Sequence, residues 1–402
     1  MKESALLLLL CGPLLTTHAQ EETVLRITAT DAVHFVVTDP VGRKTGCDPR
    51  GAQRPSIVNG IPYSNYSFET IGDIPPPGDS ASADVSLLFE FGPLSAENQG
   101  TYGLQLIGRK LGAYEISSLL ESAGNSGVTV KESTATGVIG VGQTVSYTFM
   151  LVAPFDQPIA LTKAVNKITL RQDLDNSFKL KLLGEQGFYK ELSNILDSYE
   201  KHLSKKDTLK AVKEVEKFQD RITGEYNKGT ERNDKRFITA DAWKILYEDA
   251  QYLVAHLIQL PPTPVGLTVL LQLDSLKAEV QRQQSKKNLG GTILVKGLLL
   301  SLDQAKKQLQ QADSAKAAVA VRVFQLVVDE THELTDALLE KNKPLPSLYV
   351  KDEAYIQLHY RAKYMLEALP EPRIDIQQHR LQMVDKELQK ELNALKQMTE
   401  QK

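Results

Sequence analysis

The chain has 402 residues, a formal net charge of −3 at pH 7 and a hydrophobic fraction of 42%. That length is enough for two or three domains, and the balanced charge argues against a nucleic-acid-binding protein. Its two cysteines, Cys11 and Cys47, are too few for a disulfide framework. The composition therefore favours a multidomain globular protein without covalent cross-links.

Residues 1–19 predict an export signal. Lys2 precedes an apolar run from Ala5 to Leu15, and small residues precede Gln20. The run is too short to span a bilayer, and no later stretch reaches eighteen apolar residues, so no transmembrane segment is expected after signal cleavage. We expect a secreted or periplasmic protein. Lipidation at Cys11 is disfavoured because the preceding leucines lack the small residues of a lipoprotein signal.

Residues 20–155 have a composition and pattern typical of β-structure. Short runs of β-branched and aromatic residues alternate with turn formers, as in DPVGRKTG and SAENQG. Leu25, Ile27 and Ala29 fall on one face of a strand, and Tyr102 and Leu104 repeat the pattern. The segment predicts an antiparallel β-sandwich of about seven strands. Within it, Cys47 is expected to be a half-buried side chain near a turn.

Helical patterns take over from about residue 156. Apolar residues recur three and four positions apart, and prolines at 154–158 and 261–264 act as boundaries. The fold class is therefore all-β followed by all-α. The domains expected are a sandwich at 20–155, helical bundles at 160–260 and 266–370, and a C-terminal amphipathic helix within 371–402.

The two predicted bundles align with one another. Residues 210–222 read KAVKEVEKFQDRI and residues 316–328 read KAAVAVRVFQLVV, with five identities at an offset of 106 residues. A six-residue insertion then moves the offset to 112, where Tyr252 meets Tyr364. A nearly gapless register over about seventy residues favours an internal duplication.

Each copy is expected to contain three helices. Asp207, Thr239 and Ser314 stand where helix N-caps belong. The second copy carries Val323 where the first has Lys217, so its apolar face is wider. We expect another helix to cover that face, either 267–284 or the tail at 376–400, which is expected to pack on its own bundle. The predicted helices are 187–204, 207–226 and 239–258, then 292–310, 314–341 and 351–369.

Both copies resemble the FIMAH domain, a small helical module of exported bacterial proteins that often lies beside glycan-degrading catalytic domains. The resemblance rests on a Leu-rich first helix, the KAVKEVEKFQDRI segment and a third helix reading ITADAWKILYEDAQYLVAHL. Residues 185–258 match it better than 291–369, where Arg361 replaces Asp249. The stretch VHFVVTDPVGRKTGCDP resembles a β-sandwich segment of exported bacterial proteins. These resemblances imply an accessory or binding role and bring no catalytic residue.

No familiar catalytic or cofactor motif occurs in the chain. GVIGVGQ at 137–143 lies between strand-like runs and is interpreted as a hairpin turn. Calcium is an open alternative at Asp39 with Asp48 and at Asp173 with Asp175, where solvated turns are the favoured interpretation. The scattered histidines that follow the predicted signal indicate neither a metal site nor a cofactor; they are His34, His202, His256, His332, His359 and His379.

Three aromatic side chains are the candidate ligand contacts. Tyr63, Tyr66 and Phe68 lie in IPYSNYSFETIGDIPPPG, and loops of a sandwich commonly carry recognition. The alternative is a strand that points these rings into the core.

We expect a non-enzymatic, exported bacterial protein. Its sandwich would contact a glycan or a protein partner, and its helical bundles would act as spacers or docking units. The alternative is an accessory subunit or inhibitor of an exported glycan-active hydrolase. A hydrolase with an unfamiliar site is a third hypothesis.

Overall fold

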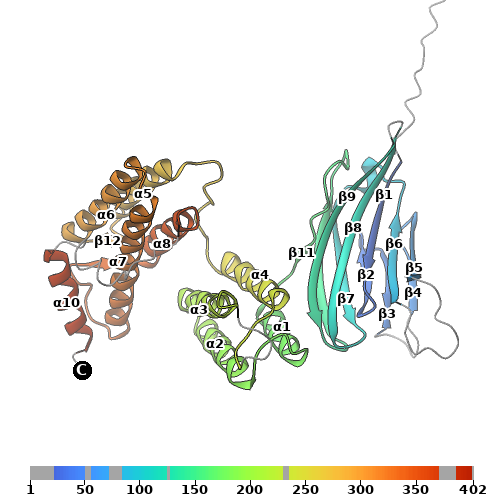
Figure 1. The fold of residues 1–402 in the computed structure, drawn as a ribbon, viewed down its shortest axis with the longest axis horizontal. Coiled ribbons are helices and arrows are strands. Elements are labelled where there is room, and N and C mark those ends of the chain that lie inside the picture. The colour runs from blue at the N-terminus through green and yellow to red at the C-terminus, as the bar shows by residue number, and fades with distance from the viewer. Residues whose placement is uncertain are drawn as a thin grey trace, which may run out of the picture. The chain divides into compact units, whose positions relative to one another are not determined.

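The computed structural model describes residues 22–49, 56–71, 84–124, 127–229, 235–370 and 386–400. The chain divides into two compact units, Met1–Leu257 and Ile258–Lys402. Figure 1 shows antiparallel strands in the first part of the chain and helices in the remainder, so the predicted order of β followed by α is confirmed. The predicted signal at 1–19 lies outside the described residues.

Unit 1 begins with two antiparallel sheets. One has the order β5-β6-β1-β8-β9, and the other has the order β11-β10-β7-β2-β3-β4. The described part holds more strands than the seven or so expected, because short polar strands and the threonine-rich β9 lack an apolar signature. The strands are β1 (Glu22–Ala29), β2 (Val33–Thr38), β3 (Lys44–Asp48), β4 (Ser56–Asn59), β5 (Ser64–Ile71), β6 (Asp84–Phe91), β7 (Gly100–Gly108), β8 (Gly112–Gly124), β9 (Gly127–Ile139), β10 (Thr144–Leu151) and β11 (Thr162–Lys163).

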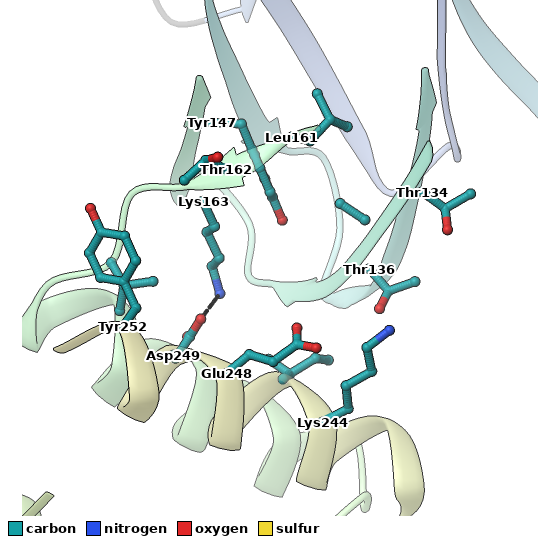
Figure 2. Close-up of a pocket in the computed structure, with 13 residues that line it drawn as sticks. Thr134, Thr136, Tyr147, Leu161, Thr162, Lys163, Lys244, Glu248, Asp249 and Tyr252 are labelled. Carbon is teal, nitrogen blue, oxygen red and sulfur yellow. Dashed lines mark hydrogen bonds and ion pairs between the residues drawn. The ribbon is translucent and has the colours of Figure 1, made fainter. Parts of the chain in front are cut away.

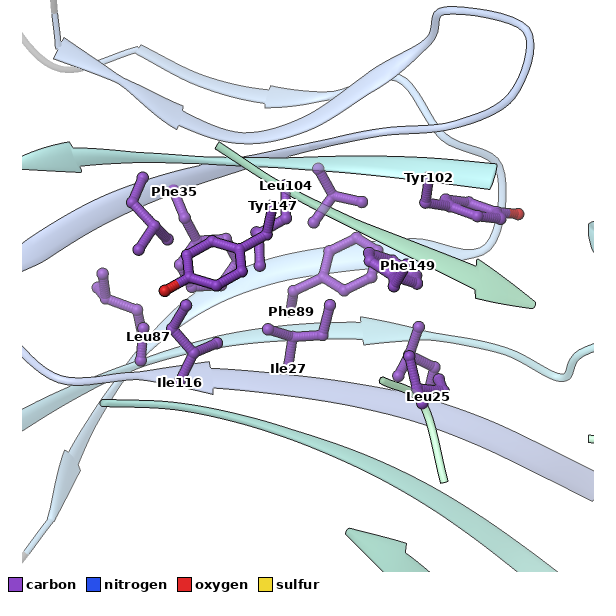
Figure 3. Close-up of a cluster of buried hydrophobic side chains, with 14 of the residues drawn as sticks. Leu25, Ile27, Phe35, Leu87, Phe89, Tyr102, Leu104, Ile116, Tyr147 and Phe149 are labelled. Carbon is purple, nitrogen blue, oxygen red and sulfur yellow. The ribbon is translucent and has the colours of Figure 1, made fainter. Parts of the chain in front are cut away.

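The inner faces of the two sheets form one hydrophobic core (Figure 3). Leu25 and Ile27 are buried as the alternation predicts, and Tyr102 stacks on Phe149 with ring centroids 5.2 Å apart. Burial of each large side chain contributes about 1.5–3 kcal/mol. Cys47 belongs to this core on β3 and is fully buried, in place of the half-buried position near a turn that was expected.

The predicted hairpin turn at GVIGVGQ is confirmed between β9 and β10. Gly142 has φ +71°, a conformation that glycine adopts without a steric penalty. The Gln143 Oε1 atom accepts hydrogen bonds from the Gly140 amide at 2.6 Å and from the Asn176 side chain at 2.7 Å. The turn therefore connects the sandwich to the helix that follows it.

The helical part of unit 1 has four helices instead of the expected three. The additional helix, α1, includes residues 173–176, which were interpreted as a solvated turn but are helical. An isolated β-bridge pairs Leu183, which precedes α2, with Ile238, which precedes α4. Asp207 caps α3 as predicted, accepting from the Lys210 amide. The helices are α1 (Lys167–Lys179), α2 (Gln186–Ser204), α3 (Thr208–Tyr226) and α4 (Ala240–Leu257).

Unit 2 follows a similar order of elements. The predicted extra helix is α5, and a two-residue strand pair, β12 with β13, joins Leu289 to Val350. The N-cap of α7 is Asp313 and not Ser314, because the Asp313 carboxylate accepts the Lys316 amide at 3.0 Å. The elements are α5 (Val269–Ser285), β12 (Leu289–Gly290), α6 (Thr292–Gln310), α7 (Ser314–Glu340), β13 (Tyr349–Val350), α8 (Asp352–Glu367) and α10 (Lys386–Glu400).

The tail helix α10 packs on α6 and α7. Leu388, Leu392 and Leu395 are buried, and Lys396 pairs with Glu330 of α7 at 2.5 Å. Val323 on α7 is fully buried, as predicted. Residues 376–385 of the predicted tail helix lie outside the described residues.

Candidate functional site

A buried lysine joins the edge of the sandwich to two helices of unit 1. The Lys163 ammonium on β11 lies 2.6 Å from the Asp173 carboxylate of α1 and 2.8 Å from the Asp249 carboxylate of α4. The Lys163 side chain is 13% exposed and each carboxylate side chain 3%. Two carboxylates therefore share one ammonium in a nearly dry environment.

Local structure explains how these three groups meet. β11 pairs with β10 so that Lys163 lies opposite Tyr147. Asp173 precedes the buried Leu174 on α1, and Asp249 precedes the buried Ala250 on α4. Both acids therefore occupy the buried stripes of their helices, where an unpaired carboxylate would be costly. Lys163 supplies the compensating charge.

The electrostatics of the three groups keep Lys163 positively charged. Burial alone would lower the pKa of Lys163, but the Asp173 and Asp249 carboxylates raise it above the ordinary lysine value. Complete burial, reinforced by the neighbouring Asp249 charge, raises the pKa of Asp173 well above the ordinary carboxyl value despite the attraction of Lys163. Lys163 is consequently a positive charge held in place and not a neutral amine nucleophile.

Two tyrosines stand beside these charges. The Tyr114 and Tyr147 hydroxyl oxygens are 2.9 Å apart, and burial raises the pKa of both phenols. Tyr147 is opposite Lys163 in the sheet, so the phenol pair extends the polar network into the sandwich core.

A cleft of about 340 Å³, with polar groups at its rim and apolar side chains in its lining, lies beside the network. Figure 2 shows Lys163 reaching from its strand toward Asp249 and Lys244 lying opposite Thr136 of β9. The side chains of the rim offer hydroxyl, ammonium, carboxylate and phenol groups. The residues lining the cleft are Thr134, Ala135, Thr136, Tyr147, Leu161, Thr162, Lys163, Val165, Lys244, Ile245, Glu248, Asp249 and Tyr252.

The three aromatic candidates from the sequence have different environments. Tyr63 is 82% exposed, whereas Tyr66 is 4% exposed and packs edge-on against Phe35 with centroids 5.1 Å apart. Phe68 is about half exposed and makes an edge contact with the Tyr66 ring at 5.6 Å. Tyr66 therefore belongs to the core, and Tyr63 and Phe68 are the two rings of this group that a ligand can reach.

Three of the four candidate calcium residues have other partners, and the fourth, Asp48, is the last residue of β3. Asp39 accepts the amides of Val41 and Arg43 within its own turn, and it pairs with the Arg43 guanidinium at 2.6 Å. Asp173 pairs with Lys163, and Asp175 accepts the Tyr189 hydroxyl at 2.8 Å. Among the described residues, the group of three potential ligands with the spacing of a metal site lies elsewhere, at His332, Asp336 and Asp352.

Sequence reasoning missed Lys163 because the lysine stands in a short polar segment with no pattern of its own. The available signal was indirect. Asp173 and Asp249 each interrupt an apolar stripe, and a buried acid needs a cation or several hydrogen-bond donors. Asp249 did enter the expected resemblance, as the acid that Arg361 replaces.

Comparison with known families adds one finding. Residues 170–255 match the FIMAH domain. The matched segment starts within α1 and ends within α4, so both Asp173 and Asp249 lie in it, while Lys163 precedes it. Comparison with curated proteins and with solved structures gives no match. None of the helices in the described part combines the length and apolar character needed to cross a membrane.

Proposed function

We propose that the protein is an exported, non-catalytic binding protein and that the cleft beside Lys163 takes a glycan. The observation that carries this proposal is the polar rim of the cleft, built from the sandwich strand β9 and the helix α4 above a buried ion network. Sugars are recognised by several convergent hydrogen-bonding groups held on rigid elements. The FIMAH match supports an accessory or structural role for the helices.

The ion network favours binding over covalent catalysis. A nucleophilic lysine needs a lowered pKa, whereas the two carboxylates raise the pKa of Lys163. Its role in the proposal is to fix the positions of α1 and α4 against β11. The exposed Thr136, Lys244 and Glu248 would make the ligand contacts.

The test is affinity electrophoresis of the full chain through gels containing soluble polysaccharides, with a glycan array to find the ligand. Lys244→Ala and Glu248→Gln are expected to weaken retention at least tenfold, since each removes an exposed contact without changing the core. Tyr63→Ala is the matched control on the sandwich loop. Retention lost in Tyr63→Ala and kept in both cleft variants would move the site to the loop. Absence of retention on any glycan would overturn the proposal.

A second candidate function, an accessory subunit of an exported hydrolase, is favoured by a groove on α2 and α3. The groove of about 470 Å³ is lined by Gly187, Lys190, Glu191, Asn194, Ile195, Ser198 and Lys217. Glu191 pairs with the Arg221 guanidinium at 2.5 Å and also with Arg236. Such a charged, ordered surface suits a polar protein contact. Salt-sensitive co-purification of a hydrolase, lost in Lys190→Glu with Lys217→Glu, would support this function over glycan binding.

We further propose that unit 2 contains a diverged second FIMAH-like module. α6 and α7 start 106 residues after α2 and α3, and α8 starts 112 residues after α4. The bridge residues Leu183 and Ile238 correspond at the same two offsets to Leu289 and Val350. An alignment of homologues supports the duplication if insertions in both modules fall between the helices, and opposes it if the register breaks within α6 or α7.

A further inference from the structure

The two helical bundles differ in a row of stacked rings along their last two long helices. In unit 1, Tyr226 of α3 stacks on Trp243 of α4 with centroids 4.6 Å apart, and Trp243 stacks on Tyr247 at 5.3 Å. At the corresponding positions of unit 2, His332 contacts Tyr355 at 4.3 Å, and Tyr355 stacks on His359 at 5.0 Å. The two tyrosines at the ends of the row in unit 1 are thus replaced by histidines in unit 2.

The first of these imidazoles faces two carboxylates. His332 is fully buried, and its Nε2 atom lies 2.9 Å from the Asp352 carboxylate and 3.6 Å from the Asp336 carboxylate. All three ligand atoms lie within 4.8 Å of one another. Unit 1 has Ala240 at the position of Asp352, so the acid and the imidazole occur together in unit 2 alone.

The spacing of these three groups also fits a shared cation. One N–H on Nε2 can reach Asp352, but 3.6 Å to Asp336 is too long for a second hydrogen bond. A cation in place of that proton would contact all three groups. Zinc–ligand bonds of about 2.0–2.2 Å place tetrahedral ligand atoms roughly 3.4 Å apart, so small side-chain shifts would complete the geometry.

The ligand atoms stand on rigid elements. His332 and Asp336 are one turn apart on α7, and Asp352 is in the first turn of α8. The Tyr355 ring packs on the imidazole and limits its rotation. An imidazole nitrogen with two carboxylates suits zinc better than calcium, which takes six to eight oxygen ligands.

We propose that His332, Asp336 and Asp352 form a zinc-binding site that joins α7 to the start of α8. Three protein ligands leave a fourth tetrahedral position open to water. Because binding requires the folded arrangement of both helices, zinc is expected to stabilise unit 2.

The test is isothermal titration calorimetry of the chelator-treated full chain with zinc chloride, together with its thermal unfolding. The wild type is expected to bind one zinc ion at the site and to show a higher Tm with zinc. Asp352→Ala and His332→Tyr, which install the residues of unit 1, are expected to weaken binding at least tenfold. Asp336→Asn tests the site with a smaller risk to folding. Calcium chloride in place of zinc is expected to give no binding.

His359→Tyr is the matched control, because it changes the other imidazole of the same row to its unit 1 counterpart. It is expected to keep zinc binding. The proposal is overturned if the wild type binds no zinc, if Asp336→Asn with Asp352→Ala binds it as tightly as the wild type, or if His359→Tyr abolishes binding while those two variants do not.

Discussion

The two helical bundles neutralise their buried acidic side chains in different ways. In unit 1, Asp173 and Asp249 are buried on α1 and α4, and their cation, Lys163, comes from the last strand of the sandwich. In unit 2, Glu279 and Arg361 stand at the positions of Asp173 and Asp249. Glu279 pairs with Arg282 of the same helix, α5, at 2.8 Å, so the acid and its cation both lie within the bundle. The bundle of unit 1 therefore depends on the sandwich for the cation that neutralises its buried acids. The bundle of unit 2 does not need a cation from another domain.

The outer helix pair of each bundle shows a second difference. In unit 1 the groove beside α2 and α3 is polar, and Glu191 binds two arginines there. In unit 2 the position of Glu191 is Gly297, and Leu388 of α10 lies where a larger side chain would stand. Charge keeps the first surface hydrated, whereas small and apolar residues let a helix cover the second.

The largest expected effect comes from removing the shared cation. Lys163→Met leaves two buried carboxylates without their partner, so the free energy of unfolding of unit 1 is expected to fall by about 3–5 kcal/mol. Trp243 is the sole tryptophan and lies in α4, so its fluorescence during urea unfolding reports on unit 1. Lys244→Met, at an exposed lysine of the same cleft, is expected to change stability by less than about 0.5 kcal/mol. Equal effects of the two variants would contradict the comparison.

The next effect concerns the helix that covers unit 2. Leu392 is fully buried on α10, so Leu392→Ala is expected to cost about 3 kcal/mol through lost burial and a residual cavity. Faster tryptic cleavage within α10 than in the wild type would reveal its release. Met398→Ala, at an exposed position of the same helix, is the control and is expected to leave the cleavage rate unchanged. Unchanged cleavage in Leu392→Ala would show that α10 is not held by this stripe.

The shared cation also predicts the pH dependence of unit 1. Since the folded-state pKa of Lys163 is raised, its stabilising contribution is complete below about pH 10.5 and is lost as the pH rises through the folded value. Asp173 acts in the same direction from lower pH, because a raised carboxyl pKa penalises folding once the pH exceeds about 3.9.

Urea unfolding of the wild type and of Asp173→Asn across a pH series checks this sign. The stability of the wild type relative to the variant is expected to increase as the pH falls, by at most about 1.4 kcal/mol per pH unit for one proton. A relative stability that decreases on acidification would mean that Asp173 behaves as an ordinary ion-paired carboxylate.

The smallest effects are expected at the helix N-caps, which lie at corresponding positions in the two bundles. Asp207 and Asp313 correspond at an offset of 106 residues and each caps its helix, so Asp→Ala at either position is expected to cost about 1 kcal/mol. Thermal unfolding by circular dichroism measures both. Ser314→Ala is expected to be nearly neutral, and a larger loss there than in Asp313→Ala would assign the cap to the serine.

Local patterns explain why most of the fold could be predicted. Alternation placed Leu25 and Ile27 inside a sheet, and helical spacing gave α6 the same bounds, 292–310, that the structure has. The proposed duplication also relates the bridge residues Leu183 and Ile238 to Leu289 and Val350, although no bridge was predicted. Helix α1 was missed because Asp173, Asp175 and Asn176 are residues that commonly favour turns, and tertiary burial overrides that preference.

These local patterns could not predict the candidate site around Lys163. Lys163 and Asp249 are far apart in the chain, and no periodicity connects a residue of a two-residue strand to a helix. The proposed zinc ligands could not be grouped from the sequence for the same reason. His332 and Asp336 share a visible helical spacing, but Asp352 joins them only through the packing of α8 on α7.

The position of Lys163 also has a consequence for the order of events during synthesis. The lysine emerges with the end of the sandwich, while Asp249 follows 86 residues later. Until α4 has been made, β11 is a two-residue edge strand whose lysine lacks one of its two carboxylates. The Lys163 network at this sheet edge therefore cannot be completed until α4 has been synthesised. Until then, the nascent chain exposes the edge formed by β11.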